Sequence, residues 1–396
     1  MQQPSTDLSG LGSLTIDAVT GLTDIIESLQ LTIPTFSGVL GTPKTNRKMG
    51  VRGKAFSGIR NLIETMGDGI DAPLEQFGSV LANNDSSPVR EAALSILNGV
   101  LGDHLVKKSN PLAITMRFRQ DGNPLDEASL RQVINQSSGK IAIMVHGSCM
   151  NDLQWNRNGH DHGAAIARDL GFEPIYLHYN SGRHISENGR EFSELLETMT
   201  AQATQDLDIV IIAHSMGGLV SRSACYYAES TSYTWIKQLK KMVFLGTPHH
   251  GANLEKAGNW IDTILDATPY SAPFSRLGKI RSSGVTDLRF GNVIDADWKG
   301  RDRFELSGDK RTPVPLPESV KCYTIAATKG KKSSMVSDKL IGDGLVTLDS
   351  AMGRHKKTKL NLLFPQSHQW LGRNMSHWSL LDHPDVYETL NSWLKD

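Results

Sequence analysis

Residues 209–218, IVIIAHSMGG, decide the fold of this 396-residue chain. The first five are apolar in succession, as in a buried strand, and apolar residues then recur at helical spacing up to residue 227. A serine in the sharp turn between a strand and a helix has a strained backbone that exposes its hydroxyl, and the residues two before and two after it must be small. Here those residues are Ala213 and Gly217. We therefore predict that Ser215 is a nucleophile, the alternative being an ordinary Ser-Gly-Gly helix start.

The rest of the chain after residue 108 alternates short apolar runs with helical stretches, which indicates β-α-β units around a mostly parallel sheet. The expected strands are residues 114–119, 141–145, 174–178, 209–213, 241–245, 322–327 and 359–364, and the expected helices are residues 164–170, 190–199, 217–228 and 384–394. Before residue 109 there are three or four amphipathic patterns, the last of them beginning at Ser87-Pro88. We predict a helical N-terminal extension over residues 1–108 and an α/β domain over residues 109–396.

The composition limits the classes of partner and the compartment. Lysine plus arginine and aspartate plus glutamate both number 42, so the net charge of zero argues against nucleic acid as the main partner. Three cysteines cannot form a disulfide framework, and an odd number fits a reducing compartment. The first residues lack a basic start and an apolar run of signal-peptide length, and no stretch approaches about 18 apolar residues. We expect a cytoplasmic protein.

Two further segments resemble lipases and esterases of the α/β-hydrolase superfamily. Residues 141–147, IAIMVHG, are similar to the strand ending in His-Gly that opens the oxyanion loop of such lipases. The resemblance implies that the N–H groups of Ser148 and Met216 bind the negative oxygen of a tetrahedral intermediate, with His146 orienting the loop. Residues 244–252, FLGTPHHGA, are similar to the Gly-Thr-Pro-His-x-Gly loop of bacterial lipases and inositol-deacylase-like hydrolases. The implied fold is that of an α/β-hydrolase, with a central sheet flanked by helices.

The catalytic acid should follow the nucleophile in the chain, on the loop after the seventh strand. Residues 342–346, GDGLV, resemble the acid loop of bacterial lipases, in which glycines let the chain turn so that the carboxylate points back at the site. We therefore predict Asp343 as the acid. Asp338 and Asp349 are the nearest alternatives.

The catalytic base should come last, after the final strand. Residues 377–387, HWSLLDHPDVY, resemble the His-x-x-Leu-Leu-x-x-Pro arrangement near the end of many lipase-like hydrolases. There the histidine lies on a loop and the segment from proline onward opens the last helix. His377 fits that place, and His383 is the alternative.

Other residues with chemical potential have simpler explanations. Cys149 lies beside the oxyanion loop but outside any sharp turn between a strand and a helix, the nucleophile elbow, so we do not expect it to be a nucleophile. His249 and His250 are adjacent on an extended loop and therefore point in different directions, which favours a structural role over metal binding. Asp161, between two histidines, is expected to cap the helix that follows it. The implied chemistry requires neither a metal ion nor an organic cofactor.

Residues 252–342 are longer than one helix and one strand require, so a cap or lid insertion is expected there. Its apolar stripe includes Trp260 and Ile264, and a lid helix over an acyl pocket and a core helix share that periodicity. The residues expected to contact substrate are His146, Gly147, His214, Trp260 and Ile264. The N-terminal helices are expected to pack on the α/β domain. A dimer contact, peripheral membrane contact through these helices or the lid, and the oligomeric state stay open.

The function implied by the resemblance is hydrolysis of carboxylic esters, as in a lipase or esterase, with an acyl ester or lipid as substrate. Ser215 would attack the ester carbonyl, His377 would take its proton, and Asp343 would hold the imidazole. The same triad serves acyltransferases, thioesterases and polyester depolymerases. A non-catalytic binding protein on the same fold is the alternative of a different class.

Overall fold

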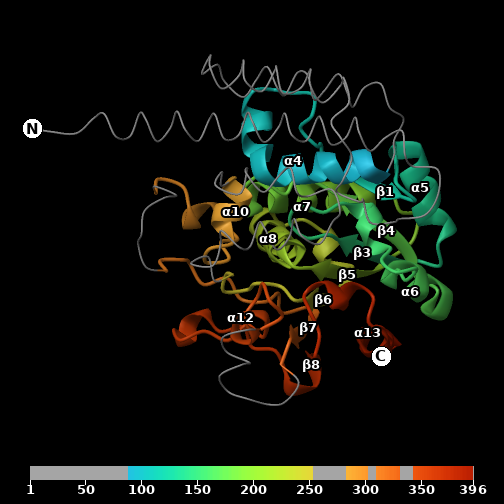
Figure 1. The fold of residues 1–396 in the computed structure, drawn as a ribbon. Coiled ribbons are helices and arrows are strands. Elements are labelled where there is room, and N and C mark those ends of the chain that lie inside the picture. Colours follow the sequence, from blue (N-terminus) through green and yellow to red (C-terminus); the bar gives the residue numbers. More distant parts are fainter. Residues whose placement is uncertain (1–87, 253–281, 302–308, 331–341, 396) are drawn as a thin grey trace, which may run out of the picture.

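The computed structural model describes residues 88–252, 282–301, 309–330 and 342–395 (Figure 1). Most of the predicted N-terminal extension therefore lies outside the described residues. So does much of the predicted cap, including Trp260 and Ile264. The domain boundary at residues 108/109 and the lid remain predictions.

The centre of the described structure is an eight-stranded sheet in the order β2-β1-β4-β3-β5-β6-β7-β8. Strand β1 runs antiparallel to both β2 and β4, and the strands from β4 through β8 pair in parallel. The strands are β1 (Arg117–Gln120), β2 (Asn123–Pro124), β3 (Lys140–Val145), β4 (Glu173–His178), β5 (Asp208–His214), β6 (Leu239–Leu245), β7 (Lys321–Thr328) and β8 (Gln369–Arg373). The predicted mostly parallel α/β sheet is confirmed.

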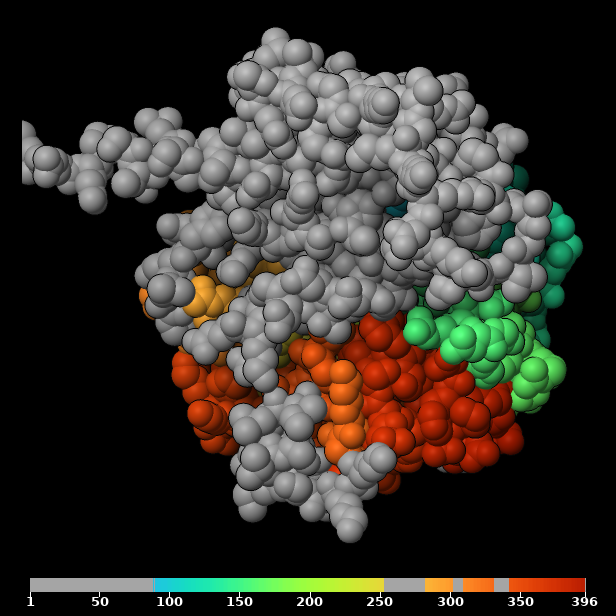
Figure 2. All heavy atoms as spheres, in the orientation of Figure 1, coloured from blue at the N-terminus to red at the C-terminus, as the bar shows by residue number. Residues whose placement is uncertain are grey.

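Both faces of the sheet are covered, which explains why its central strands are continuous apolar runs. Alternate residues of β3 point to opposite sides, so Ile143 belongs to one hydrophobic cluster and Met144 to the other. The first cluster includes side chains of α4 (Pro88–Lys107), α5 (Glu127–Gln136), α7 (Ile185–Ala201) and α8 (Met216–Thr231). The second includes side chains of α6 (His162–Leu170) and α13 (Pro384–Lys395). The C-terminal residues, coloured red, form much of the lower half of the face seen in Figure 2.

Helix α4 is part of this core. Six of its apolar side chains are at most 3% exposed: Ala93, Ile96, Leu97, Val100, Leu101 and Leu105. In Figure 1 it lies on the side of the sheet away from α13. The expectation that the N-terminal helices pack on the α/β domain is therefore confirmed for this last helix of the predicted extension.

The predicted strand at residues 359–364 is wrong. A short 3-10 turn, Thr358–Leu360, lies there, and the last strand is β8, which pairs with β7. Leu362 and Phe364 are buried while Leu363 is 86% exposed, so a loop that packs on the core produces the alternation of a strand. Strand β8 is half-buried at the edge of the sheet and has a weak apolar signal. Helix α5, which the sequence reading did not predict, begins where Asp126 caps it by accepting from the N–H of Ser129.

No helix among the described residues is long and apolar enough to cross a membrane.

Candidate active site

Ser215 occupies the turn between β5 and α8. Its backbone has φ 55° and ψ −124°, a conformation that is strained for any residue other than glycine. The N–H of Ser215 donates to the carbonyl of Leu245 at the end of β6, at 2.8 Å, which holds the turn against the sheet. A Cβ at Gly217 would lie 2.5 Å from the carbonyl oxygen of Val145, so this position accepts only glycine. The predicted strand, sharp turn and helix are therefore all present.

Asp343 and His377 form a buried pair. Nδ1 of His377 lies 2.6 Å from Oδ2 of Asp343, and the two side chains are 2% and 1% exposed. The other carboxylate oxygen, Oδ1, accepts from the N–H groups of Leu345 and Val346 at 2.9 and 2.8 Å. The N–H of His377 also donates to the carbonyl of Asp343. These contacts hold the carboxylate in one orientation. Because a carboxylate accepts hydrogen bonds, the contact favours the tautomer of His377 with its proton on Nδ1.

His377 lies over the ends of β5 and β6, where Ser215 also lies. A Cβ on Gly246, the residue after β6, would be 3.0 Å from Cε1 of His377. The ring of His377 is 4.6 Å from that of His214, the residue before the serine, and Nε2 of His214 is 3.3 Å from the carbonyl of His377. Nε2 of His377 is buried and has no hydrogen-bond partner among the described residues. This nitrogen is therefore free to accept a proton.

The alternatives for the acid and the base are placed differently. Asp349 lies in the first turn of the short helix α12 (Leu348–Ala351), and Asp338 lies outside the described residues. The side chain of His383 is 36% exposed and has Asp385 at 3.9 Å as its nearest carboxylate. Asp343 and His377 are thus the acid and histidine that the structure brings together.

The loop after β3 crosses Ser215 closely. A Cβ at Gly147 would be 3.0 Å from Cβ of Ser215. Ser148 follows and is 2% exposed, while Met216 is the first residue of α8, where backbone N–H groups lack intrahelical acceptors. In the part of the chain that the structure describes, neither the N–H of Ser148 nor that of Met216 has an acceptor. Two unpaired donors beside a serine hydroxyl can bind an anionic oxygen.

His146 supports this loop from beneath. Its ring stacks on Tyr179 at 4.3 Å, Nδ1 is 2.8 Å from the carbonyl of Gly147, and the hydroxyl of Tyr179 donates to the carbonyl of His146. Burial lowers the pKa of His146 to about 3, so the ring is neutral near pH 7. His214 is also fully buried, against His377. Of the residues expected to contact substrate, Gly147 therefore lies against Ser215, while His146 and His214 lie beneath the site.

Cys149 is 2% exposed, and burial raises the pKa of its thiol to about 11. A protonated thiol is a poor nucleophile, in agreement with the sequence interpretation. Asp161 caps α6 by accepting from the N–H of Ala164, as predicted. Among the described residues, no group of three or more histidine, cysteine and acidic side chains is arranged to hold a metal ion.

Two contacts that hold the loop after β3 were not indicated by any pattern in the sequence. Ser181, on the loop after β4, accepts from the N–H of Cys149 at 3.0 Å. Arg119 on β1 donates to Asp152, which ends the loop after β3, at 3.0 Å. These partners are 32 and 33 residues apart in the chain, and neither belongs to a motif.

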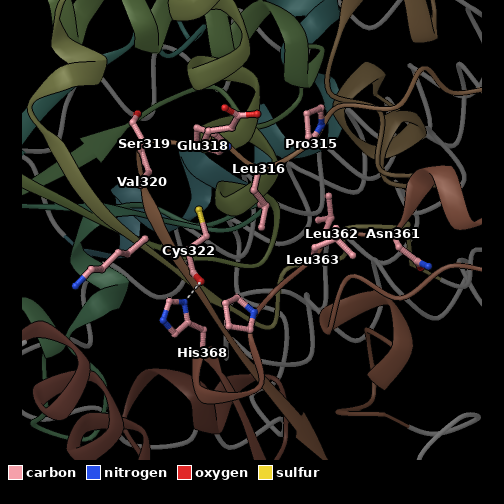
Figure 3. Close-up of a pocket in the computed structure, with 13 residues that line it drawn as sticks. Pro315, Leu316, Glu318, Ser319, Val320, Cys322, Asn361, Leu362, Leu363 and His368 are labelled. Atoms are coloured by element: carbon pink, nitrogen blue, oxygen red, sulfur yellow. Dashed lines mark hydrogen bonds between the residues drawn. The ribbon is translucent and has the colours of Figure 1, made fainter.

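A hollow of about 450 Å³ lies elsewhere, around the start of β7 (Figure 3). Its walls include Leu316, Val320 and Leu362, and Nδ1 of His368 contacts the carbonyl of Cys322 at 3.0 Å. Ser215, Asp343 and His377 do not line it. Since Ser215, Asp343 and His377 follow the opposite ends of the strands, this hollow is not part of the candidate active site.

Two features identify the architecture. The sheet has an antiparallel strand, β1, beside the parallel strands that begin with β4, and a serine with a strained backbone lies between β5 and α8. The chain has the α/β-hydrolase fold. A family model described as a domain of unknown function (DUF7379) matches residues 119–278 of this α/β-hydrolase-like chain. No curated protein sequence matches it.

Several solved structures are similar to the chain. The mature form of lipase BlEst2 from Bacillus licheniformis has 17% sequence identity and a TM-score of 0.42, over 71% of this chain and 97% of the lipase. EstA from Clostridium botulinum has 12% identity and a TM-score of 0.42, over 65% and 87% of the two chains. Aspergillus fumigatus lipase B has 12% identity and a TM-score of 0.40, over 95% and 85%. The fold assignment itself rests on the strand order and the elbow.

Proposed function

We propose that this protein hydrolyses carboxylic esters through a Ser215–His377–Asp343 triad. The observation that carries the proposal is the buried 2.6 Å contact between His377 and Asp343, located over the strand ends where Ser215 occupies a strained turn. An imidazole nitrogen without a hydrogen-bond partner, held over the same strand ends as a serine, can act as the base that makes an alcohol nucleophilic. Two of the similar solved structures are named as lipases.

In the proposed first half-reaction, Oγ of Ser215 attacks the ester carbonyl carbon while Nε2 of His377 takes the hydroxyl proton. The carbonyl oxygen becomes an anion and accepts from the N–H groups of Ser148 and Met216. When the intermediate collapses, the bond to the alcohol breaks and His377 gives its proton to the leaving oxygen. Asp343 stays ionised throughout and stabilises the imidazolium.

In the second half-reaction, His377 takes a proton from water, and the resulting hydroxide oxygen attacks the acyl-enzyme. The intermediate expels Oγ of Ser215, which recovers its proton, and the carboxylic acid leaves. Each oxyanion donor of this kind contributes on the order of 10² to 10³ in rate. An alcohol in place of water would give acyl transfer, and a thioester or polyester would enter by the same steps.

We propose an acyl ester or lipid as substrate and the cytoplasm as the location, since all three cysteines are free thiols. Contact with a membrane surface is compatible with this proposal. A panel of p-nitrophenyl and glycerol esters of increasing acyl length, with and without emulsion, distinguishes an esterase from a lipase. Product analysis in the presence of an alcohol distinguishes hydrolysis from acyl transfer.

The experiment that tests the proposal is labelling with a fluorophosphonate together with p-nitrophenyl ester turnover. We expect the wild-type protein to be labelled and Ser215→Ala to lose both labelling and turnover. Ser221→Ala is the matched control, because Ser221 is buried on the same helix and donates only to the carbonyl of Gly217. If Ser215→Ala is as active as the control, turnover does not pass through Ser215 and the proposed triad is wrong. If the wild-type protein is neither labelled nor active on any ester, a binding function becomes the better explanation.

A further inference from the structure

Helix α4 meets the loop after β3 through a glycine. A Cβ built on Gly99 would lie 2.3 Å from Sγ of Cys149, 3.1 Å from its Cβ and 3.0 Å from its Cα. Rotating the thiol away would therefore still leave a contact with the loop backbone. Gly99 lies in the middle of a 20-residue helix, where glycine is a poor helix former, so close packing is the reason for its presence.

Cys149 is itself in an unusual conformation. Its φ is 59°, which is uncommon for a residue other than glycine, and its N–H donates to Oγ of the buried Ser181. Ser148, whose N–H is the proposed oxyanion donor, is the residue immediately before it. The position of that donor therefore depends on how Cys149 is held between α4 on one side and Ser181 on the other.

The same helix also holds the far end of the loop. Glu91 of α4 accepts from Arg119 at 2.8 Å, and Arg119 in turn donates to Asp152 at 3.0 Å. Nδ1 of His178 lies 3.2 Å from the same carboxylate oxygen of Asp152. All four side chains are at most 8% exposed, so these charges are shielded from water and their positions are restricted.

We infer that α4, an element outside the α/β domain as the sequence defined it, positions the oxyanion loop, and that Gly99 is the positioning residue that acts through Cys149. The inference rests on the proposed ester hydrolase function. Oxyanion donors must lie about 2.7–3.1 Å from the developing anion. A methyl group at position 99 needs about 1 Å of additional space, and a misplacement of that size costs on the order of 10²-fold in rate. The effect should appear in kcat, because the donors bind the transition state more strongly than the ground state.

The test is a double-mutant cycle at positions 99 and 149 in the full chain. We expect Gly99→Ala to lower kcat for a p-nitrophenyl ester at least about 10-fold, with KM changed less than about 2-fold. In a Cys149→Gly background the same substitution should lower kcat less than about 3-fold, since glycine removes Sγ and Cβ and suits a φ of 59°. Equal effects of Gly99→Ala in the two backgrounds would overturn the inference.

Two further variants separate positioning from loss of stability. Leu97→Ala removes buried core contacts and adds no bulk toward Cys149, so it should lower Tm while α4 keeps its place in the folded protein, and kcat should stay within about 2-fold. If it lowers kcat as much as Gly99→Ala, the effect follows helix stability and the inference fails. Ser181→Ala adds no bulk and removes the acceptor of the Cys149 N–H, so it should fold and lower kcat about 3- to 10-fold. An unchanged kcat in Ser181→Ala would also contradict the inference.

The Ser215→Ala variant distinguishes the two proposals. If it abolishes turnover and the cycle shows no coupling, the hydrolase proposal stands and only the role of α4 is wrong. If it retains turnover, the hydrolase proposal itself fails.

Discussion

Asp343→Asn should nearly abolish esterase activity while leaving the shape of the site unchanged. In the wild-type protein, Oδ1 accepts from two backbone N–H groups and Oδ2 faces Nδ1 of His377. An asparagine oxygen can keep the two backbone hydrogen bonds, because those donors cannot turn. Its NH₂ group then faces Nδ1 of His377, which must accept instead of donating, so the ring proton moves to Nε2. A protonated Nε2 cannot take the proton of Ser215.

The size of the effect follows from this change of tautomer. The contact is 2.6 Å long and both side chains are at most 2% exposed, so water offers no alternative partner at Nδ1. In serine hydrolases with the same arrangement, the same substitution costs about 10⁴ in kcat. At about 1.36 kcal/mol for each factor of ten, this corresponds to about 5.4 kcal/mol of transition-state stabilisation. KM should change little, because the ground-state contacts of the ester are untouched.

The assay is steady-state hydrolysis of a p-nitrophenyl ester together with the rate of fluorophosphonate labelling. Asp349→Asn is the matched control, since it makes the same chemical change six residues further along, in the first turn of α12. We expect the control to stay within about 2-fold of wild type. If Asp343→Asn keeps more than about a tenth of the wild-type kcat, then Asp343 does not set the tautomer of His377.

Two other predictions concern pH and thiol chemistry. Burial lowers the pKa of His146 to about 3 and that of His162 to about 4, so near pH 5 the unfolded chain binds protons that the folded protein excludes. The free energy of unfolding should therefore be highest above about pH 6.5 and fall toward pH 4. Each histidine should contribute up to about 1.4 kcal/mol per pH unit to this fall. Urea titrations that show a constant free energy of unfolding over this range would refute the prediction. Iodoacetamide at pH 8 should leave turnover intact, since burial raises the pKa of all three thiols, and rapid inactivation would argue for a cysteine nucleophile.

The elbow could be predicted because its signal is local. An apolar run, a serine flanked by small residues and a helical stripe are all contained within 19 residues, and short-range sterics impose the strained turn. The pairing of Asp343 with His377 could be predicted only through family motifs, since the two lie 34 residues apart and spacing alone does not bring them together. The expectation failed at residues 359–364, where a loop packed on the core has the same alternation as a strand.

Local patterns were thus sufficient to locate the strained serine turn and the α/β character of the chain, because backbone preferences and apolar periodicity act over a few residues. The contact of Gly99 with Cys149, and the ion pairs that join Glu91, Arg119 and Asp152, were decided by the folded arrangement. Such contacts depend on which surfaces of distant segments pack together when the chain folds and water is excluded. Neither the periodicity nor the composition of a single sequence indicates which surfaces these are.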